Sequence, residues 1–131
     1  MEKRERPSAD AWLREAKAAA AAADCGMYLL HNGVVRRSAK AKARGLDAAA
    51  ADVTGMQFSY DREKAAAAIS AAEAMEGIQF VRVWLAEGRL SVGDDIMYVL
   101  IGGDIRPHVI DALQALVGRL KNECVTETEL T

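Results

Sequence analysis

Residues 96–121, IMYVLIGGDIRPHVIDALQALVGRLK, decide the fold of this chain. The apolar run 96–101 predicts a buried strand, and two glycines follow it directly. Beyond the glycines, apolar side chains recur at helical spacing and predict an amphipathic helix with one apolar face. Asp104 is expected to cap that helix, and Pro107 suits its first turn.

The segments before this stretch extend the same pattern. Ser8 or Asp10 can cap a first helix that runs to about Ala23, and Asp61 can cap a second helix that Gly77 ends. Extended patterns predict strands at 27–36, 53–60, 78–85 and 89–91. Because the later strands are joined by short links, we predict an α+β fold, a mainly antiparallel sheet with three helices on one face.

Length and charge limit the classes of function. The chain has 131 residues, which predicts a single domain, and a formal net charge of −2. That charge gives no reason to expect nucleic acid or a membrane surface as a partner. No apolar run is long enough to span a bilayer, and the charged N-terminus lacks the apolar core of a signal peptide. We therefore expect a cytoplasmic protein.

The cysteines and histidines do not predict a metal or cofactor site. Cys25 and Cys124 are too few for a disulfide framework, and we expect free thiols, with a single bridge left open as the alternative. His31 and His108 have no third residue at metal-ligand spacing. Walker, nucleophile-elbow and dinucleotide motifs are also missing.

Charge is distributed unevenly along the chain. Five of the nine residues 36–44 are Arg or Lys, with no acid among them. Residues 37–52 have no strand pattern and predict a mobile loop, which either binds a phosphate or acidic partner or is simply solvated. Composition favours the solvated loop. We also expect residues 1–7 to be flexible and residues 122–131 to form an acidic tail.

The junction after the two glycines is a candidate anion site. A helix N-terminus presents free backbone N–H groups, and Arg106 would add a full cation beside them. The alternative is that the glycines only permit the turn and that Arg106 is solvated. Lys121, one helix later, would by itself be a charge that complements the negative helix end.

Three motifs together resemble the large, catalytic subunit of molybdopterin synthase, the MoaE-like family. The most specific is VWLAEGRLSVGDDIMYVLIGG, residues 83–103, in which Gly-Arg-Leu-x-Val-Gly-(Asp/Glu) lies between two apolar strands. A helix ending in Leu120 and Lys121 follows it. Earlier, GVVR at residues 33–36 resembles the Gly-x-Val-Arg strand end of that family.

The resemblance implies an α/β-hammerhead type of fold and a homodimer. It implies that a small ubiquitin-like sulfur carrier inserts its C-terminal Gly-Gly tail, as a thiocarboxylate, into the active site. Sulfur would then pass to cyclic pyranopterin monophosphate, a sulfurtransferase step of molybdenum cofactor biosynthesis. Lys121 would be the catalytic lysine, and Arg36, Arg37 and Arg106 would bind the pterin phosphate, with no metal or cofactor.

The chain also departs from the family pattern. Where the family has a histidine this chain has Ile105, and where it has a second tail lysine this chain has Thr128. Arg37 and Ser38 follow the strand end, where the family continues Asn-His. Three interpretations stay open: a molybdopterin synthase large subunit with part of its active-site set missing, a non-catalytic dimeric relative that binds a partner protein or anionic ligand, or an unrelated domain that shares the strand-turn-strand pattern.

Overall fold

The structure is a computed structural model, which describes residues 5–131. Residues 1–4 of the segment predicted to be flexible therefore lie outside the described residues. The elements, in chain order, are α1 (Ala9–Ala18), a 3-10 turn η1 (Ala20–Asp24), β1 (Met27–Val34), α2 (Lys40–Ala43), β2 (Gly55–Tyr60), α3 (Arg62–Glu73), β3 (Ile78–Leu85), β4 (Gly88–Ser91), β5 (Asp95–Gly103), α4 (Arg106–Arg119), a π-helical turn η2 (Leu120–Cys124) and β6 (Val125–Leu130).

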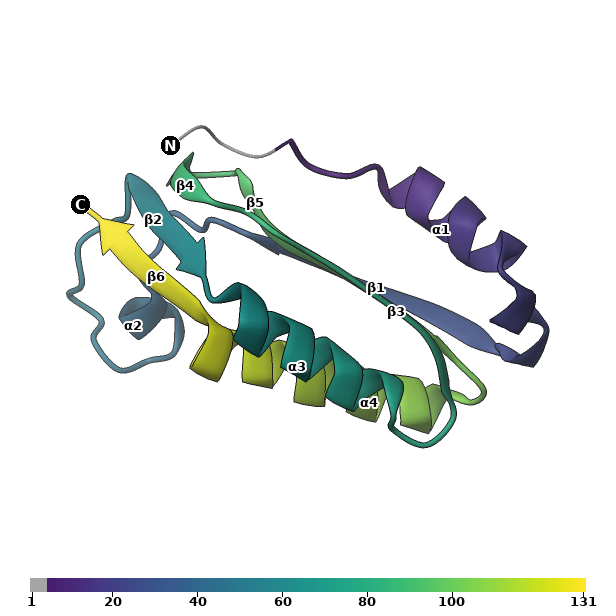
Figure 1. The fold of residues 1–131 in the computed structure, drawn as a ribbon. Coiled ribbons are helices and arrows are strands. Elements are labelled where there is room, and N and C mark those ends of the chain that lie inside the picture. The colour runs from purple at the N-terminus through teal and green to yellow at the C-terminus, as the bar shows by residue number, and fades with distance from the viewer. Residues whose placement is uncertain (1–4) are drawn as a thin grey trace.

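The long sheet has the strand order β1-β5-β3, and all its pairings are antiparallel. The run 96–101 lies in its central strand β5, where every side chain is at most 5% exposed, so the predicted buried strand is confirmed. Helices α3 and α4 lie side by side along one face of this sheet (Figure 1). The predicted α+β class with mainly antiparallel strands is confirmed.

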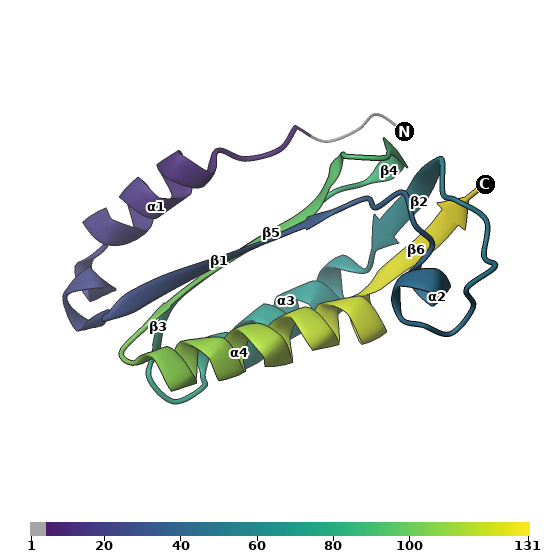
Figure 2. The same cartoon turned by 180° about the vertical axis from the view of Figure 1, so that it is seen from behind.

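Helix α1 covers the other face of the long sheet, as Figures 1 and 2 show, so the expectation of helices on one face was wrong. The cause is an aromatic cluster on the α1 side of β5. Trp12 of α1 and Trp84 of β3 both pack edge-on against Tyr98, with ring centroids 6.1 and 5.9 Å away. Such pairs stabilise a contact beyond the area they bury.

A second sheet, β4-β2-β6, lies at one end of the molecule. Strand β6 was not predicted, because the acidic tail carries few apolar residues to mark a strand. It forms because β2 offers a free edge: Tyr60 pairs with Val125 and Gly55 with Leu130, and the ladder continues between them. The tail is therefore part of the sheet.

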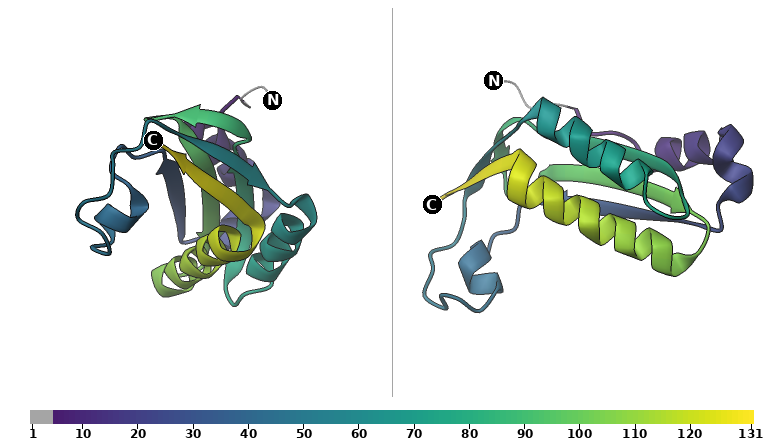
Figure 3. Two further views of the ribbon diagram at one scale, coloured as in Figure 1. Left: turned by 90° about the vertical axis from the view of Figure 1, so that its left-hand side faces the viewer. Right: turned by 60° about the horizontal axis from the view of Figure 1, so that its bottom comes forward.

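The predicted loop 37–52 contains the short helix α2, so the described residues form four α-helices where three were predicted. α2 and its flanking loop lie beside β6 (Figure 3). Both cysteines are free thiols, Cys124 buried and Cys25 half-buried. In the described part of the chain, no helix combines the length and apolar character needed to cross a bilayer.

The two glycines after β5 are needed for close packing. A Cβ on Gly102 would lie 2.7 Å from the ring of Tyr28, and one on Gly103 would lie 2.8 Å from the carbonyl oxygen of Gly77. Asp104 is not the N-cap of α4, which is Ile105 and makes no side-chain cap. The Asp104 carboxylate instead accepts hydrogen bonds from the Ile105 backbone N–H, at 2.6 Å, and from His108 Nδ1, at 2.8 Å.

Candidate functional site

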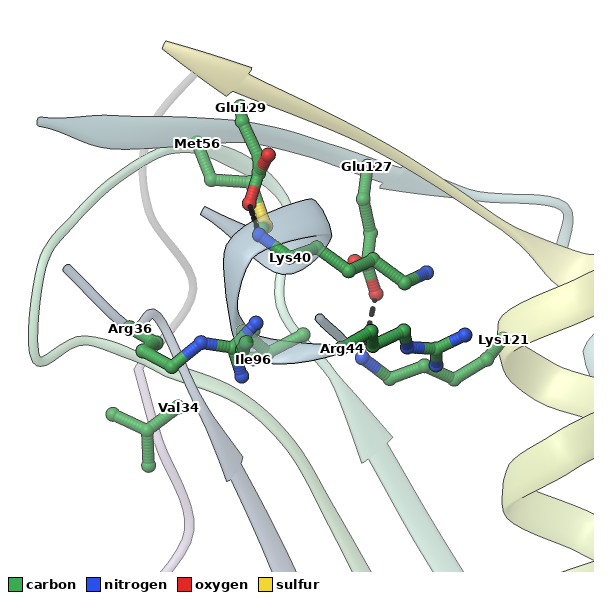
Figure 4. Close-up of a pocket in the computed structure, with 10 residues that line it drawn as sticks. Val34, Arg36, Lys40, Arg44, Met56, Ile96, Lys121, Glu127 and Glu129 are labelled. Carbon is green, nitrogen blue, oxygen red and sulfur yellow. Dashed lines mark hydrogen bonds and ion pairs between the residues drawn. The ribbon is translucent and has the colours of Figure 1, made fainter. Parts of the chain in front are cut away.

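A cavity of about 270 Å³ opens where the end of β1, α2, η2 and β6 meet. Figure 4 shows side chains from all of these elements converging on it. Its charged lining consists of four cations and two carboxylates: Arg36, Lys40, Arg44, Lys121, Glu127 and Glu129. This group is called the cationic pocket below, because its formal charge is positive.

Arg36 reaches the pocket from the second position after β1, which ends at Val34. Val35 is 2% exposed, and its backbone N–H and carbonyl are hydrogen-bonded to Asp94 and Gly93 in the turn before β5, at 2.9 Å each. The next residue therefore leaves the sheet at a fixed point. The Arg36 Nε donates to the carbonyl oxygen of Ser38 at 3.0 Å, which orients the guanidinium locally.

Helix α2 supplies the second and third cations. Lys40 and Arg44 are four residues apart, one turn of helix, so both side chains leave the same face of this segment. The backbone N–H of Lys40 donates to Glu129 Oε2 at 2.8 Å and so attaches α2 to β6. Among the described residues, no ion pair reaches Arg36, Lys40 or Arg44.

Lys121 enters the pocket from the π-helical turn that follows α4. Its neighbour Leu120 is fully buried and anchors the turn. The Lys121 Nζ lies 2.9 Å from Glu127 Oε1, and the two side chains are 30% and 14% exposed. Apart from this ion pair, no hydrogen bond within residues 5–131 satisfies Glu127 Oε1, which is itself buried.

The acidic wall of the pocket consists of Glu127 and Glu129, which point inward because side chains alternate between the two faces of β6. Glu127 and Glu129 are two residues apart on β6 and pair with Phe58 and Met56, both buried, so they share the inner face. Thr128, between them, pairs with the exposed Gln57 on the outer face. The position that the family pattern gives to a second lysine therefore points away from the pocket.

The structure brings together only part of the predicted site. Arg36 and Lys121 meet in the cationic pocket, whereas Arg37 and Arg106 do not line it. Arg106 begins α4 and Lys121 follows its end, and a helix of 14 residues is about 21 Å long. Beside the predicted anion site at the start of α4, the Asp104 carboxylate accepts a hydrogen bond from the backbone N–H of Ile105, the residue before Arg106.

Two histidines have shifted protonation equilibria. The hydrogen bond that His108 donates to Asp104 raises the pKa of His108, and the same contact lowers the pKa of Asp104. The pKa of His31, on β1, is lowered first by its burial and then by the positive charge of Lys121. Both effects favour the neutral form of His31.

Sequence reasoning missed four of the six charged residues that line the pocket. Lys40 and Arg44 stood out only as part of a cationic run, and nothing in the sequence placed that run opposite the end of α4. Glu127 and Glu129 were expected only as part of an acidic tail, because the strand that turns them inward was not predicted. The alternation of Glu and Thr at 126–129 was the available signal.

The cationic pocket is suited to an anionic ligand that contacts the amine of Lys121. Guanidinium and ammonium groups bind phosphate or carboxylate oxygens through charge-assisted hydrogen bonds. In a partly enclosed cavity these interactions are stronger than in bulk water.

Known proteins share both the sequence pattern and the fold. Residues 7–123 match the family model described as MoaE protein, while no curated protein matches the sequence significantly. Molybdopterin synthase from Staphylococcus aureus superposes with a TM-score of 0.73 at 14% identity, over 96% of this chain and 86% of that one. The molybdopterin biosynthesis MoaE protein from Burkholderia ambifaria MC40-6 gives 0.70 at 17% identity, over 96% and 84%. A complex of subunits 1 and 2 of molybdopterin-converting factor from Helicobacter pylori 26695 gives 0.65 at 14% identity, over 92% and 73%.

Proposed function

This chain belongs to the MoaE protein family, and on that premise we propose that it acts in molybdenum cofactor biosynthesis as the large subunit of a molybdopterin synthase. The partner is a small ubiquitin-like protein whose C-terminal Gly-Gly tail carries a thiocarboxylate. Sulfur passes from that tail to cyclic pyranopterin monophosphate. A solved relative that is a complex of two subunits supports a two-subunit assembly.

One observation carries the proposal. Arg36 and Lys121, the strand-end arginine and the helix-end lysine of the family pattern, come from distant parts of the chain and line one cavity. Lys40 and Arg44 enlarge the positive charge there. The cations would hold the phosphate of the pterin and the negative charge that develops during transfer, with the Lys121 amine at the reacting group.

The proposal includes a homodimer, because Arg106 cannot join this pocket from its own chain. It lies at the far end of α4, about 21 Å from the helix end that precedes Lys121. A second copy is therefore needed to bring an Arg106 to the pterin phosphate. Arg37 lies next to Arg36 but does not line the pocket, and we assign it no contact with substrate.

The test is conversion of the pyranopterin precursor in vitro with a thiocarboxylated small subunit. We expect molybdopterin from the wild-type chain and a loss of about a hundredfold or more for Lys121→Ala. A folded wild-type protein that forms no product above the enzyme-free control would contradict the catalytic function.

A second candidate, a non-catalytic relative that binds a partner or anionic ligand, has one observation in its favour. Lys121 is already paired with a carboxylate of its own chain. Under this alternative, Lys121→Ala leaves the biological phenotype unchanged in a deletion strain, whereas variants that break the dimer do not.

A further inference from the structure

We infer that Glu127 is the positioning residue for Lys121: it holds the Nζ inside the cationic pocket against the repulsion of the neighbouring cations. The inference rests on the proposed function, since it concerns the lysine that would carry the chemistry. Nothing in the family pattern requires a carboxylate at this place.

The first step is the crowding of positive charge. Lys121 shares a cavity of about 270 Å³ with Arg36, Lys40 and Arg44. Like charges that line one small cavity repel each other, and the repulsion is stronger where protein replaces water. A lysine side chain is also long and flexible, so it loses entropy when it is fixed. Without a counter-charge, Lys121 would swing out toward water.

The second step is that Glu127 is placed to supply the counter-charge. Its Oε1 lies 2.9 Å from Lys121 Nζ, and its side chain is only 14% exposed. A carboxylate this far from water is costly unless it is paired. The other acid in the pocket, Glu129, is bound to the backbone N–H of Lys40 instead. Each carboxylate thus has its own partner.

The third step is the rigidity of both supports. Glu127 stands opposite Phe58, which is fully buried, in the middle of the β2–β6 ladder. Lys121 leaves the π-helical turn next to the fully buried Leu120. A reacting group held by rigid elements is already in productive geometry, so no further loss of side-chain entropy is needed to position it. The pair therefore presets the position of the amine before any ligand arrives.

Glu127→Gln tests the inference because it keeps the size of the side chain and removes its charge. Glu123→Gln is the matched control: this acid lies four residues earlier, in η2, is 63% exposed and pairs with Arg119 at 3.8 Å. The first readout is the rate at which N-hydroxysuccinimidyl acetate acetylates Lys121, followed by mass spectrometry. The second is kcat and KM for the pterin precursor.

We expect Glu127→Gln to raise the acetylation rate of Lys121 about threefold or more, because the released amine meets solvent. We expect kcat to fall about tenfold or more with a smaller change in KM. Glu127→Asp should recover part of kcat, and Glu123→Gln should match wild type. Thermal unfolding of each variant shows that the fold is kept.

Two results would overturn the inference. One is a Lys121 acetylation rate in Glu127→Gln that equals the wild-type rate. The other is turnover by Glu127→Gln that equals or exceeds wild type, which would make the carboxylate an obstacle to the lysine. If the wild-type protein itself forms no product, the proposed function fails, but the acetylation ratio still decides whether Glu127 holds Lys121.

Discussion

Arg106 and Lys121 lie at opposite ends of α4, so one copy of this chain cannot use both at one site. A homodimer that combines them would build each site from two protomers. Co-expression of Arg106→Ala with Lys121→Ala then yields heterodimers in which one site has both residues and the other has neither. We expect about a quarter of wild-type turnover, since about half of the dimers are mixed and half of their sites are intact.

Each variant alone should have little activity in that experiment. Each variant carries a different affinity tag, and the share of dimers retained by both affinity columns in succession measures the mixed fraction. Turnover of the mixture that stays at the level of the single variants would show that the two residues do not share a site.

Arg36 should act on binding more than on turnover. Its guanidinium lines the cationic pocket and has no ion-pair partner within residues 5–131, so it is available to a phosphate. We expect Arg36→Ala to raise KM for the pterin precursor about tenfold, the loss of one charge-assisted contact. Lys42→Ala, on α2 but outside the pocket lining, is the control, and a KM change as large as that of Arg36→Ala would point to charge effects at long range.

Gly102 should not tolerate a side chain. A Cβ there would lie 2.7 Å from the ring of Tyr28, near the end of the central strand β5. We expect Gly102→Ala to lower the free energy of unfolding by about 1–3 kcal/mol, measured by urea denaturation. Gly118→Ala, in α4 with open space around it, should instead gain up to about 1 kcal/mol. Equal effects at both positions would contradict the packing argument.

His108 should make stability depend on pH. The pKa of His108 is raised in the folded chain, chiefly by Asp104. Its contribution to the free energy of unfolding is therefore complete below about pH 6.5, the ordinary pKa of histidine, and is lost as pH rises through the raised pKa. The pKa of Asp104 is lowered, so its contribution is present above about pH 4 and is lost as pH falls further. Glu76, with Oε2 3.6 Å from His108 Nε2, also raises the pKa of His108.

The pair should therefore stabilise the fold most between about pH 4 and pH 6.5. Thermal unfolding of wild type and His108→Gln at pH 5.5 and pH 8.5 checks this. The wild-type advantage should be larger at pH 5.5, and an advantage that grows toward pH 8.5 would be the wrong sign.

The sequence predicted the elements that have a strong local pattern, but not those that form only through pairing with distant segments. Strand β3 (Ile78–Leu85) and the Asp61 cap of α3 followed from local pattern alone. Strand β6 exists because the free edge of β2 pairs with it, which a short polar segment cannot reveal. The cap predicted for Asp104 failed because His108 and the Ile105 N–H engage its carboxylate from another direction.

The same limit applied to the site. Arg36 and Lys121 could be named from motifs, and the structure brings them into one cavity. Arg106 could be named equally well, but the length of α4 separates it from the other two in one chain. Glu127 could not be found, because its role depends on which face of an unpredicted strand it occupies.

Because side chains alternate along β6, the charge of the pocket's acidic wall depends on the number of residues that precede Glu127 in this strand. Glutamate and threonine alternate there, so insertion of one residue between η2 and Thr126 would move Thr126 and Thr128 to the inward positions that Glu127 and Glu129 now occupy. Threonine hydroxyls would then replace both carboxylates without a single substitution. A one-residue insertion at the start of β6 is thus a direct evolutionary route from a partly neutralised pocket to a more strongly basic one.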